Sequence, residues 1–246
     1  MRADAARAAG LGVAVAALVG IPTLGPPLLG TSESAARYDT AVTPPDYAFA
    51  IWAPIFAGCL ATAARVGRHA TAGRPASAED RALGWPLAGA CALAAGWSVA
   101  SQADRFALTP ALLPPAAGFA ALAFRRLQAV PGTGETIGSA TAGLLLGWTA
   151  LAAVVNLSAA TQLRGADPTS RASVVGSTVA VAVTAAGVAR TVRTASRGGR
   201  TLAAATVWGL VTTALDGRRT RSARAGTAVG AAVVLAAAVT RPQPRT

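Results

Sequence analysis

The sequence contains no lysine and few of the residues that usually carry chemistry. Its 246 residues include one histidine, His69, and two cysteines, Cys59 and Cys91. No thiol stands beside a base and no pair of carboxylates falls within an apolar run, so the usual nucleophilic and acid–base constellations are missing. The residues themselves therefore do not predict an enzyme. Because both cysteines lie inside apolar runs, they indicate neither a disulfide nor a metal site.

Charge is also scarce. Charged residues make up 13% of the chain and hydrophobic residues 53%, which is too apolar for an ordinary soluble domain. The net charge of +12 comes from 22 arginines against 10 acids. A basic excess is typical of nucleic-acid binding, but these arginines fall between the apolar runs, where they would meet anionic lipid headgroups. The sequence thus predicts membrane lipids as partners and no nucleic acid.

Apolar runs long enough to cross a bilayer recur along the whole chain. A transmembrane helix needs roughly 20 residues, at about 1.5 Å rise per residue, to cross a hydrocarbon core of about 30 Å. The pattern predicts an all-α fold, a polytopic transmembrane helical bundle of about eight spans. The expected spans are residues 8–29, 46–64, 83–102, 107–124, 137–160, 172–189, 201–215 and 225–239.

Two of these runs allow a second interpretation. The first follows Arg2 and Arg7 in the manner of a signal peptide. A retained helix is favoured, because the run continues past Pro22 and no small-residue cleavage pattern closes it. The seventh run, 201–215, covers only about 22 Å, so either its ends snorkel or it does not fully cross.

The distribution of arginine predicts the orientation of the bundle. With a cytoplasmic N-terminus in a bacterial cytoplasmic membrane, most arginines lie on the inner side of the first five spans. The loop 216–224 violates the rule, since it carries four arginines on the outer side. A re-entrant seventh run would return this loop to the inside and place the C-terminus outside, so the side of the C-terminus stays open at this stage.

The stretch PPDYAFAIWAPIF, residues 44–56, contains four aromatic residues and three prolines within thirteen residues. We interpret it as the wall of a site, with Pro54 expected to kink the second span. Alternation of the spans places Trp97, Gln102 and Asn156 in the same half of the membrane, and Trp148 near mid-depth. Prolines of the fourth span loosen the bundle in that half.

Each of these residues also has a plainer interpretation. Trp85 and Tyr47 are typical of the aromatic belt at the membrane surface. Trp52 and Trp97 fit core packing as well as a pocket wall, and Asn156 fits a helix–helix hydrogen bond as well as a ligand contact. In the linker 65–81, Glu79, Asp80 and His69 form a cluster that we expect to be solvated surface.

Two motifs together resemble the TspO/translocator-protein family, also called tryptophan-rich sensory proteins. They are PP-x-Y-x-F-x-I-W-x-x-x-F, in which Trp52 is followed by Phe56, and LLLGW-x7-N, in which Trp148 is followed by Asn156. The resemblance covers residues 8–160. It implies a five-helix domain over 1–160 and three additional transmembrane helices over 161–246, as in the longer bacterial branch. Trp97 lacks the Asn that usually precedes the tryptophan pair of the third helix.

The resemblance also implies a function. Family members bind porphyrins, other tetrapyrroles and sterol-like ligands, so the expected function is a membrane receptor or carrier for a planar hydrophobic ligand. Passive transport of a lipid-like molecule and a non-catalytic scaffold remain alternatives. No cofactor is expected beyond a porphyrin-like or haem-like ligand, and a homodimer stays open. The expected ligand-binding residues are Phe49, Trp52, Phe56, Trp97, Trp148 and Asn156.

Overall fold

The protein is an all-helical bundle. The computed structural model describes residues 2–29, 38–132 and 134–241, and within these ranges it contains no strand. The α-helices are α1 (Arg2–Leu29), α2 (Trp52–Thr71), α3 (Ala78–Gln102), α4 (Leu113–Gln128), α5 (Ile137–Ala160), α6 (Arg171–Thr194), α7 (Gly199–Leu215) and α8 (Arg221–Val239). Short 3₁₀ helices are η2 (Asp46–Ile51), η3 (Phe106–Ala111) and η4 (Gln162–Arg164).

Side-chain caps explain where several helices begin. Ser77 and Thr136 each accept a hydrogen bond from a backbone N–H of the first turn, in a capping box. Ser170 and Thr220 cap α6 and α8 in the same way, through the side-chain oxygen alone. Each cap satisfies a backbone donor that has no partner within its helix. The polar residues between the apolar runs are therefore used mainly as helix boundaries.

The second span begins differently from our expectation. Pro54 does not kink a helix interior, because α2 starts at Trp52 and the preceding residues form the 3₁₀ helix η2. Pro54 therefore lies in the first turn, where a missing backbone N–H costs no hydrogen bond. The linker after α2 is also shorter than the polar stretch suggested: α2 continues to Thr71 and α3 starts at Ala78.

Among the described residues, seven helical segments are long and apolar enough to cross a membrane, and α7 is not among them. Its 17 residues extend about 26 Å, slightly less than a hydrocarbon core of about 30 Å. It nevertheless runs between the two ends of the bundle. Gly198 at its start abuts the carbonyl of Ser139 near the start of α5, while Asp216 at its end meets the group of Asp39 and Arg219 at the opposite end. In the described part of the chain, eight helices therefore run from one end of the bundle to the other, each antiparallel to the one before it.

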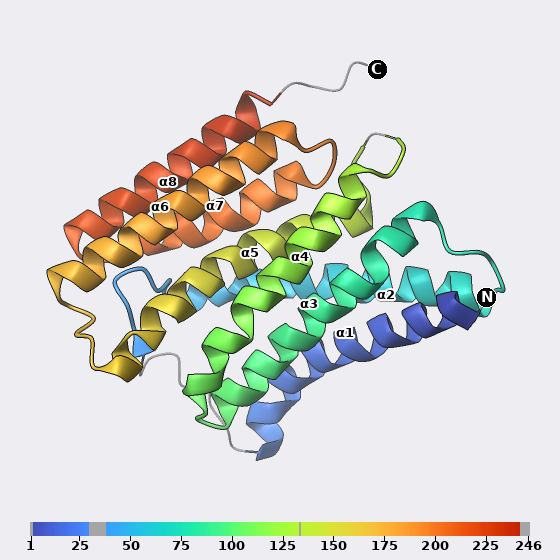
Figure 1. Ribbon diagram of the computed structural model, residues 1–246, viewed down its shortest axis with the longest axis horizontal. Helices are drawn as coiled ribbons and strands as arrows, with labels where there is room; N and C mark the ends of the chain where they lie inside the picture. Colours follow the sequence, from blue (N-terminus) through green and yellow to red (C-terminus); the bar gives the residue numbers. More distant parts are fainter. Residues whose placement is uncertain (1, 30–37, 133, 242–246) are drawn as a thin grey trace.

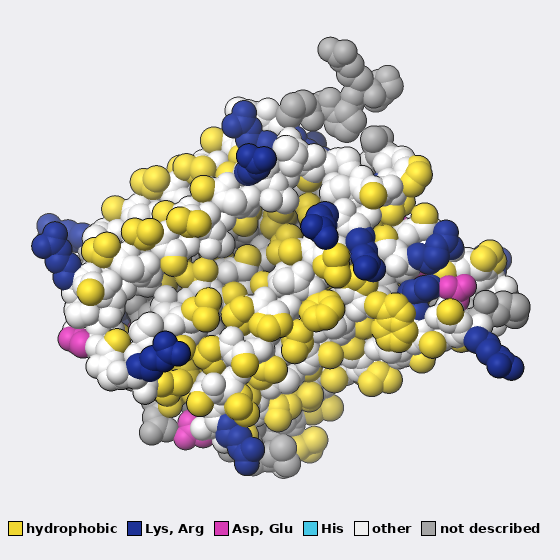
Figure 2. All heavy atoms as spheres, in the orientation of Figure 1, with side chains coloured by type: hydrophobic (Ala, Val, Ile, Leu, Met, Phe, Trp, Pro, Cys, Tyr) yellow, Lys and Arg dark blue, Asp and Glu magenta, His cyan; other side chains and the backbone are white. Residues whose placement is uncertain are grey.

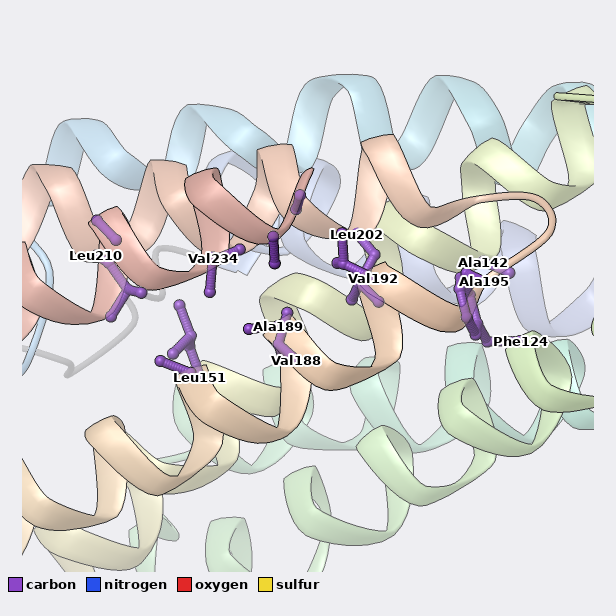
Figure 3. Packing of buried hydrophobic residues seen from close by; sticks show 14 of the residues in the cluster. Phe124, Ala142, Leu151, Val188, Ala189, Val192, Ala195, Leu202, Leu210 and Val234 are labelled. Carbon is purple, nitrogen blue, oxygen red and sulfur yellow. The ribbon is translucent and has the colours of Figure 1, made fainter. Parts of the chain in front are cut away.

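The helices form two neighbouring groups that meet at α4 and α5, each with a hydrophobic cluster of its own. In Figure 1, α6, α7 and α8 lie side by side along one edge, and α5 and α4 lie between them and α1 to α3. Buried side chains of α4 and α5 join those of α6 to α8 in one hydrophobic cluster, part of which is drawn in Figure 3. The last three helices are therefore packed into the bundle through α5.

Two glycines allow α5 and α7 to approach each other closely. A Cβ atom on Gly143 would lie 2.4 Å from the carbonyl oxygen of Gly198, and one on Gly147 would lie 2.6 Å from that of Leu202. No side chain fits at either position. Gly143 and Gly147 therefore form a small-xxx-small contact of the kind that brings membrane helices into backbone contact.

The cluster of Glu79, Asp80 and His69 is not solvated surface. Asp80 is fully buried; Arg65 Nη1 lies 2.8 Å from its Oδ1, and His69 Nδ1 lies 3.0 Å from its Oδ2. Glu79 accepts hydrogen bonds from Arg65 and from Thr136 at the start of α5. The cluster joins three helices because a buried carboxylate needs a partner for its charge.

The surface matches a protein embedded in lipid. On the face shown in Figure 2, hydrophobic side chains cover the middle of the molecule and arginines gather toward the two ends of the helices. Exposed aliphatic residues include Val175, Val179 and Val183 on α6 and Val229 and Val233 on α8. Together with the seven long apolar segments, this surface identifies an integral membrane protein.

The arginines of the loop 216–224 also have a structural explanation. Arg219 is buried and paired with Asp39 and Asp216, and Arg218 pairs with Asp216. Arg224 donates to the carbonyl of Ala214. Of the four arginines in this loop, Arg219 is therefore bound inside the protein, whereas Arg218, Arg221 and Arg224 are exposed.

Candidate functional site

An aromatic cavity lies between α3, α5, η2 and the start of α2. It has a volume of about 60 Å³. Among the expected residues, Phe49, Trp52, Trp97, Trp148 and Asn156 all line it. Residues from three separate crossings therefore meet in one layer, as the alternation of the spans predicts.

The rings meet mainly edge to face. Trp148 is almost fully buried on α5, and the rings of Phe49 and Trp52 stand against it with centroids 5.5 Å and 6.5 Å away and interplanar angles of 82° and 81°. This arrangement places the positive edge of one ring on the negative face of another. It fixes Trp148 as the centre of the aromatic group, with the two rings of the second span around it.

A polar pair stands among these rings. Trp97 Nε1 donates to Asn156 Oδ1 over 3.0 Å, and Asn156 Nδ2 donates to the carbonyl of Ala152 over 3.0 Å. Both the indole N–H and the amide are thereby satisfied in an apolar setting. Asn156 thus makes the helix–helix hydrogen bond of the plainer interpretation and also faces the cavity.

Phe56 belongs to an adjoining cavity. This second space, of about 210 Å³, is lined by Phe49, Trp52 and Trp97 as well as by Phe56, and it lies toward α1. The Phe56 ring packs against Trp52 with centroids 5.4 Å apart. The two cavities share three aromatic rings, so those rings form the partition between them.

Gln102 does not join this group. Its amide donates to the carbonyl of Ile21 and to Ser98, which ties α3 to α1. The side chain lines a separate groove between those two helices. Trp85 and Tyr47 are exposed, at 52% and 57% of their surface, and also stay outside the cavity.

The sequence did not single out two rings that line the cavity. Tyr38, before the second span, stacks flat on Phe106 of η3, with centroids 3.8 Å apart and an interplanar angle of 11°. Both lie at the far end of the bundle from the N-terminus. Tyr38 stands between Arg37 and Asp39, and Phe106 follows Arg105, so neither belongs to an aromatic pattern that the sequence would show.

Among the described residues, no Asp, Glu, Arg or His side chain lines the aromatic cavity. Its polar groups are the side chains of Tyr38, Thr43, Ser101 and Asn156 and the tryptophan N–H groups. Within the described residues there is also no group of three or more His, Cys, Asp or Glu that could hold a metal ion. The described lining of the cavity is therefore mostly apolar and aromatic, with a few groups that can form hydrogen bonds.

Comparison with known families now adds to this geometry. The family model described as TSPO-like protein matches residues 12–241. The chain belongs to the TSPO-like protein family. The matched range of this TSPO-like protein includes α6 to α8 as well as the first five helices. Searches of curated proteins and of solved structures returned no match.

In this TSPO-like protein the two motifs behind the resemblance face each other. Trp52 and Phe56 come from the proline-rich start of α2, whereas Trp148 and Asn156 come from α5. The contact between Trp52 and Trp148 joins the two motifs directly. The assignment of these residues to ligand binding, and the division of the chain at residue 160, stay predictions.

Proposed function

We propose that this membrane protein binds a planar hydrophobic ligand, of the tetrapyrrole class, between the rings of the aromatic cavity. The observation that carries the proposal is the meeting of Phe49, Trp52 and Trp148 around a space that none of the charged side chains in the described part of the chain lines. Flat aromatic faces favour a flat ligand, and Asn156 offers one polar group to orient it.

The size of the cavity adds a condition. Ligand pockets usually have about 300–1,000 Å³, whereas the two adjoining cavities have about 60 Å³ and about 210 Å³. The proposed binding therefore requires that the shared rings or the chain that covers them move apart. On this proposal the structure is the closed, ligand-free state.

Binding of protoporphyrin tests the proposal. The protein in lipid nanodiscs is titrated with protoporphyrin, and the absorbance shift of the porphyrin reports the bound fraction. Replacing Trp52 and Trp148 by alanine together removes two large contact surfaces, each worth about 1.5–3 kcal/mol when buried. We expect at least tenfold weaker binding. Unchanged affinity in the double variant would contradict the proposal.

Two further variants guard against a folding defect. Trp85→Ala removes an exposed tryptophan outside the cavity and should leave binding unchanged. Trp148→Phe keeps an aromatic ring at the centre of the site and should weaken binding less than Trp148→Ala. A graded loss in the order Phe then Ala indicates ring contacts, whereas equal loss in both indicates a general defect of the fold.

A further inference from the structure

Residues 38–51, which we call the strap, form one wall of the aromatic cavity. Tyr38, Thr43, Pro44 and Phe49 of the strap line it. The strap has no long helix of its own, since it consists of a turn around residues 41–42 and the short helix η2. Whatever holds the strap in place therefore also keeps the cavity closed.

Arg219 holds the first part of the strap. Its Nη1 donates to Asp39 Oδ2 and to the Thr40 carbonyl, both over 2.7 Å, and its Nε donates to Asp216 Oδ2 over 3.1 Å. The guanidinium is only 6% exposed. Charge-assisted hydrogen bonds from a buried planar group are strong and directional. Arg219 thereby fixes the strap to the loop between α7 and α8.

Trp208 on α7 holds the second part. Its Nε1 donates to the carbonyl of Ala48 over 2.7 Å, and its ring meets Tyr47 edge to face with centroids 6.5 Å apart. Ala48 is fully buried and directly precedes Phe49, which stands against Trp148 in the cavity. The hydrogen bond therefore positions a ring of the site from outside it.

Two further contacts extend this attachment. Val42 at the turn of the strap is 2% exposed and belongs to the hydrophobic cluster that contains residues of α6 to α8. Gln162 of η4 donates to the Asp39 carbonyl over 2.8 Å. The strap is thus fastened mainly to elements that follow α5.

We propose that α6 to α8 serve as the latch of the ligand site, with Arg219 and Trp208 as positioning residues that set how fast a ligand enters and leaves. The inference rests on the proposed function, because a cavity of about 60 Å³ admits a planar ligand only when its wall moves. Moving the strap outward breaks the bonds of both residues. The rates, more than the affinity, should therefore respond to their removal.

The first experiment needs no ligand. Cys59 and Cys91 are replaced by alanine, Val42→Cys is introduced, and its reaction with a membrane-impermeant maleimide is timed in nanodiscs. A closed strap protects this buried position, so Arg219→Gln and Trp208→Phe should each raise the labelling rate at least fivefold. The matched controls Arg221→Gln and Trp85→Phe should leave it unchanged. Equal rates in all five proteins would overturn the latch.

A second variant tests the same contact without removing Arg219, whose loss could disturb the fold. Asp39→Asn removes the ion pair from the strap side, where the carboxylate is 44% exposed, and leaves Arg219 paired with Asp216. It should also raise the labelling rate, by less than Arg219→Gln. A labelling rate equal to that of the parent protein would count against Arg219 as an anchor.

The second experiment measures protoporphyrin binding kinetics by stopped flow. Arg219→Gln and Trp208→Phe should speed association and dissociation by similar factors, at least fivefold, with a smaller change in Kd. If the parent binds protoporphyrin and both variants keep its rates, the latch is wrong while the proposed function stands. If the parent does not bind protoporphyrin, the proposed function fails, and the maleimide rates alone decide whether the latch exists.

Discussion

Asp80 is a fully buried carboxylate at the end of the bundle where the N-terminus lies, and it joins α2 to α3. Arg65 and His69 face it from α2, and Ser77 donates its backbone N–H to it. The Asp80 side chain thus forms an ion pair with Arg65 and also caps the start of α3. Removal would leave the Arg65 guanidinium, 22% exposed, with Glu79 as its remaining carboxylate partner.

We therefore expect Asp80→Ala to destabilise the protein strongly. Breaking a buried ion pair from one side costs up to about 3–5 kcal/mol when the other charge is left uncompensated, and the remaining pair of Arg65 with Glu79 lowers this cost. The measurement is the unfolding temperature of the purified protein in detergent. Asp167→Ala, at an exposed position in the loop before α6, is the matched control and should unfold like the parent. Equal unfolding temperatures for the two variants would refute the structural role of Asp80.

Single residues also show what a sequence can and cannot predict here. Trp52, Trp148 and Asn156 were found because rare residues stand out against an alanine-rich background. Asp80 was misread as surface, because the sequence pattern ended the second span at residue 64 and began the third at residue 83, whereas α2 continues to Thr71 and α3 begins at Ala78. Tyr38 and Phe106 were missed, since their stacking depends on how two loops meet and no local pattern encodes that.

At the scale of elements, the contact between α5 and α7 depends on the absence of side chains. Gly143 and Gly147 face the backbone of α7 so closely that a Cβ atom would collide with carbonyl oxygens. We expect Gly147→Val to force the helices apart and to lower the free energy of unfolding by about 1–3 kcal/mol, the typical cost of overpacking a core. Denaturant unfolding followed by tryptophan fluorescence measures the change.

The chain offers a matched glycine for this comparison. Gly187 lies on the exposed side of α6 and has no atom within 4 Å of the position of a Cβ. Gly187→Val should therefore leave the unfolding midpoint close to that of the parent. Similar losses at both glycines would mean that valine harms the helices themselves and that close packing is not the reason.

Because carboxylates bind the arginines of the loop between α7 and α8, we expect the attachment of the strap to depend on pH. The pKa of Asp216 lies below its ordinary value, mainly because Arg218 donates hydrogen bonds to it, and the charge of Arg219 adds to this. Asp39 of the strap also forms an ion pair with Arg219. A carboxylate with a lowered pKa stabilises the folded state above the ordinary pKa of about 3.9, and the stabilisation is lost as the pH falls through the lower, folded value.

The attachment of the strap should therefore be insensitive to pH from about 8 to about 5 and should weaken only below about pH 4. Labelling of Val42→Cys with a dipyridyl disulfide, which reacts with thiols at acid pH, measures this. Val181→Cys, at a buried position on α6, corrects for the pH dependence of the reagent. A rise in strap labelling already between pH 7 and pH 5 would contradict the prediction.

The elements themselves were the most predictable part of the fold. Long apolar runs bounded by arginine fix the helices, since a span needs a minimum length of hydrocarbon-compatible residues. The closeness of α5 and α7 could not be predicted, because small residues occur everywhere in this chain. The kink expected at Pro54 was wrong, because the sequence does not show that a 3₁₀ turn precedes it.

At the scale of the whole molecule, eight crossings bring both ends of the described chain to the same end of the bundle. Arg7 packs on Gly84 at the start of α3, and Arg241 reaches Gly199 at the start of α7. We expect tags at the two termini to be accessible from one side of the membrane. Gly217→Cys, in the loop between α7 and α8, should react from the other side. Tags on opposite sides would exclude this arrangement.

The length of α7 connects the protein to its surrounding lipid. Its lipid-facing stripe, Ala204, Trp208, Val211 and Leu215, is shorter than the hydrocarbon core of a typical bilayer. Either the bilayer beside α7 becomes thinner, or the polar ends of α7 are drawn into the hydrocarbon core. Trp208 belongs to this stripe and Arg219 to the loop at its end. On the proposed latch, acyl-chain length should change the rate at which the strap opens, so the labelling rate of Val42→Cys should differ between membranes of different thickness.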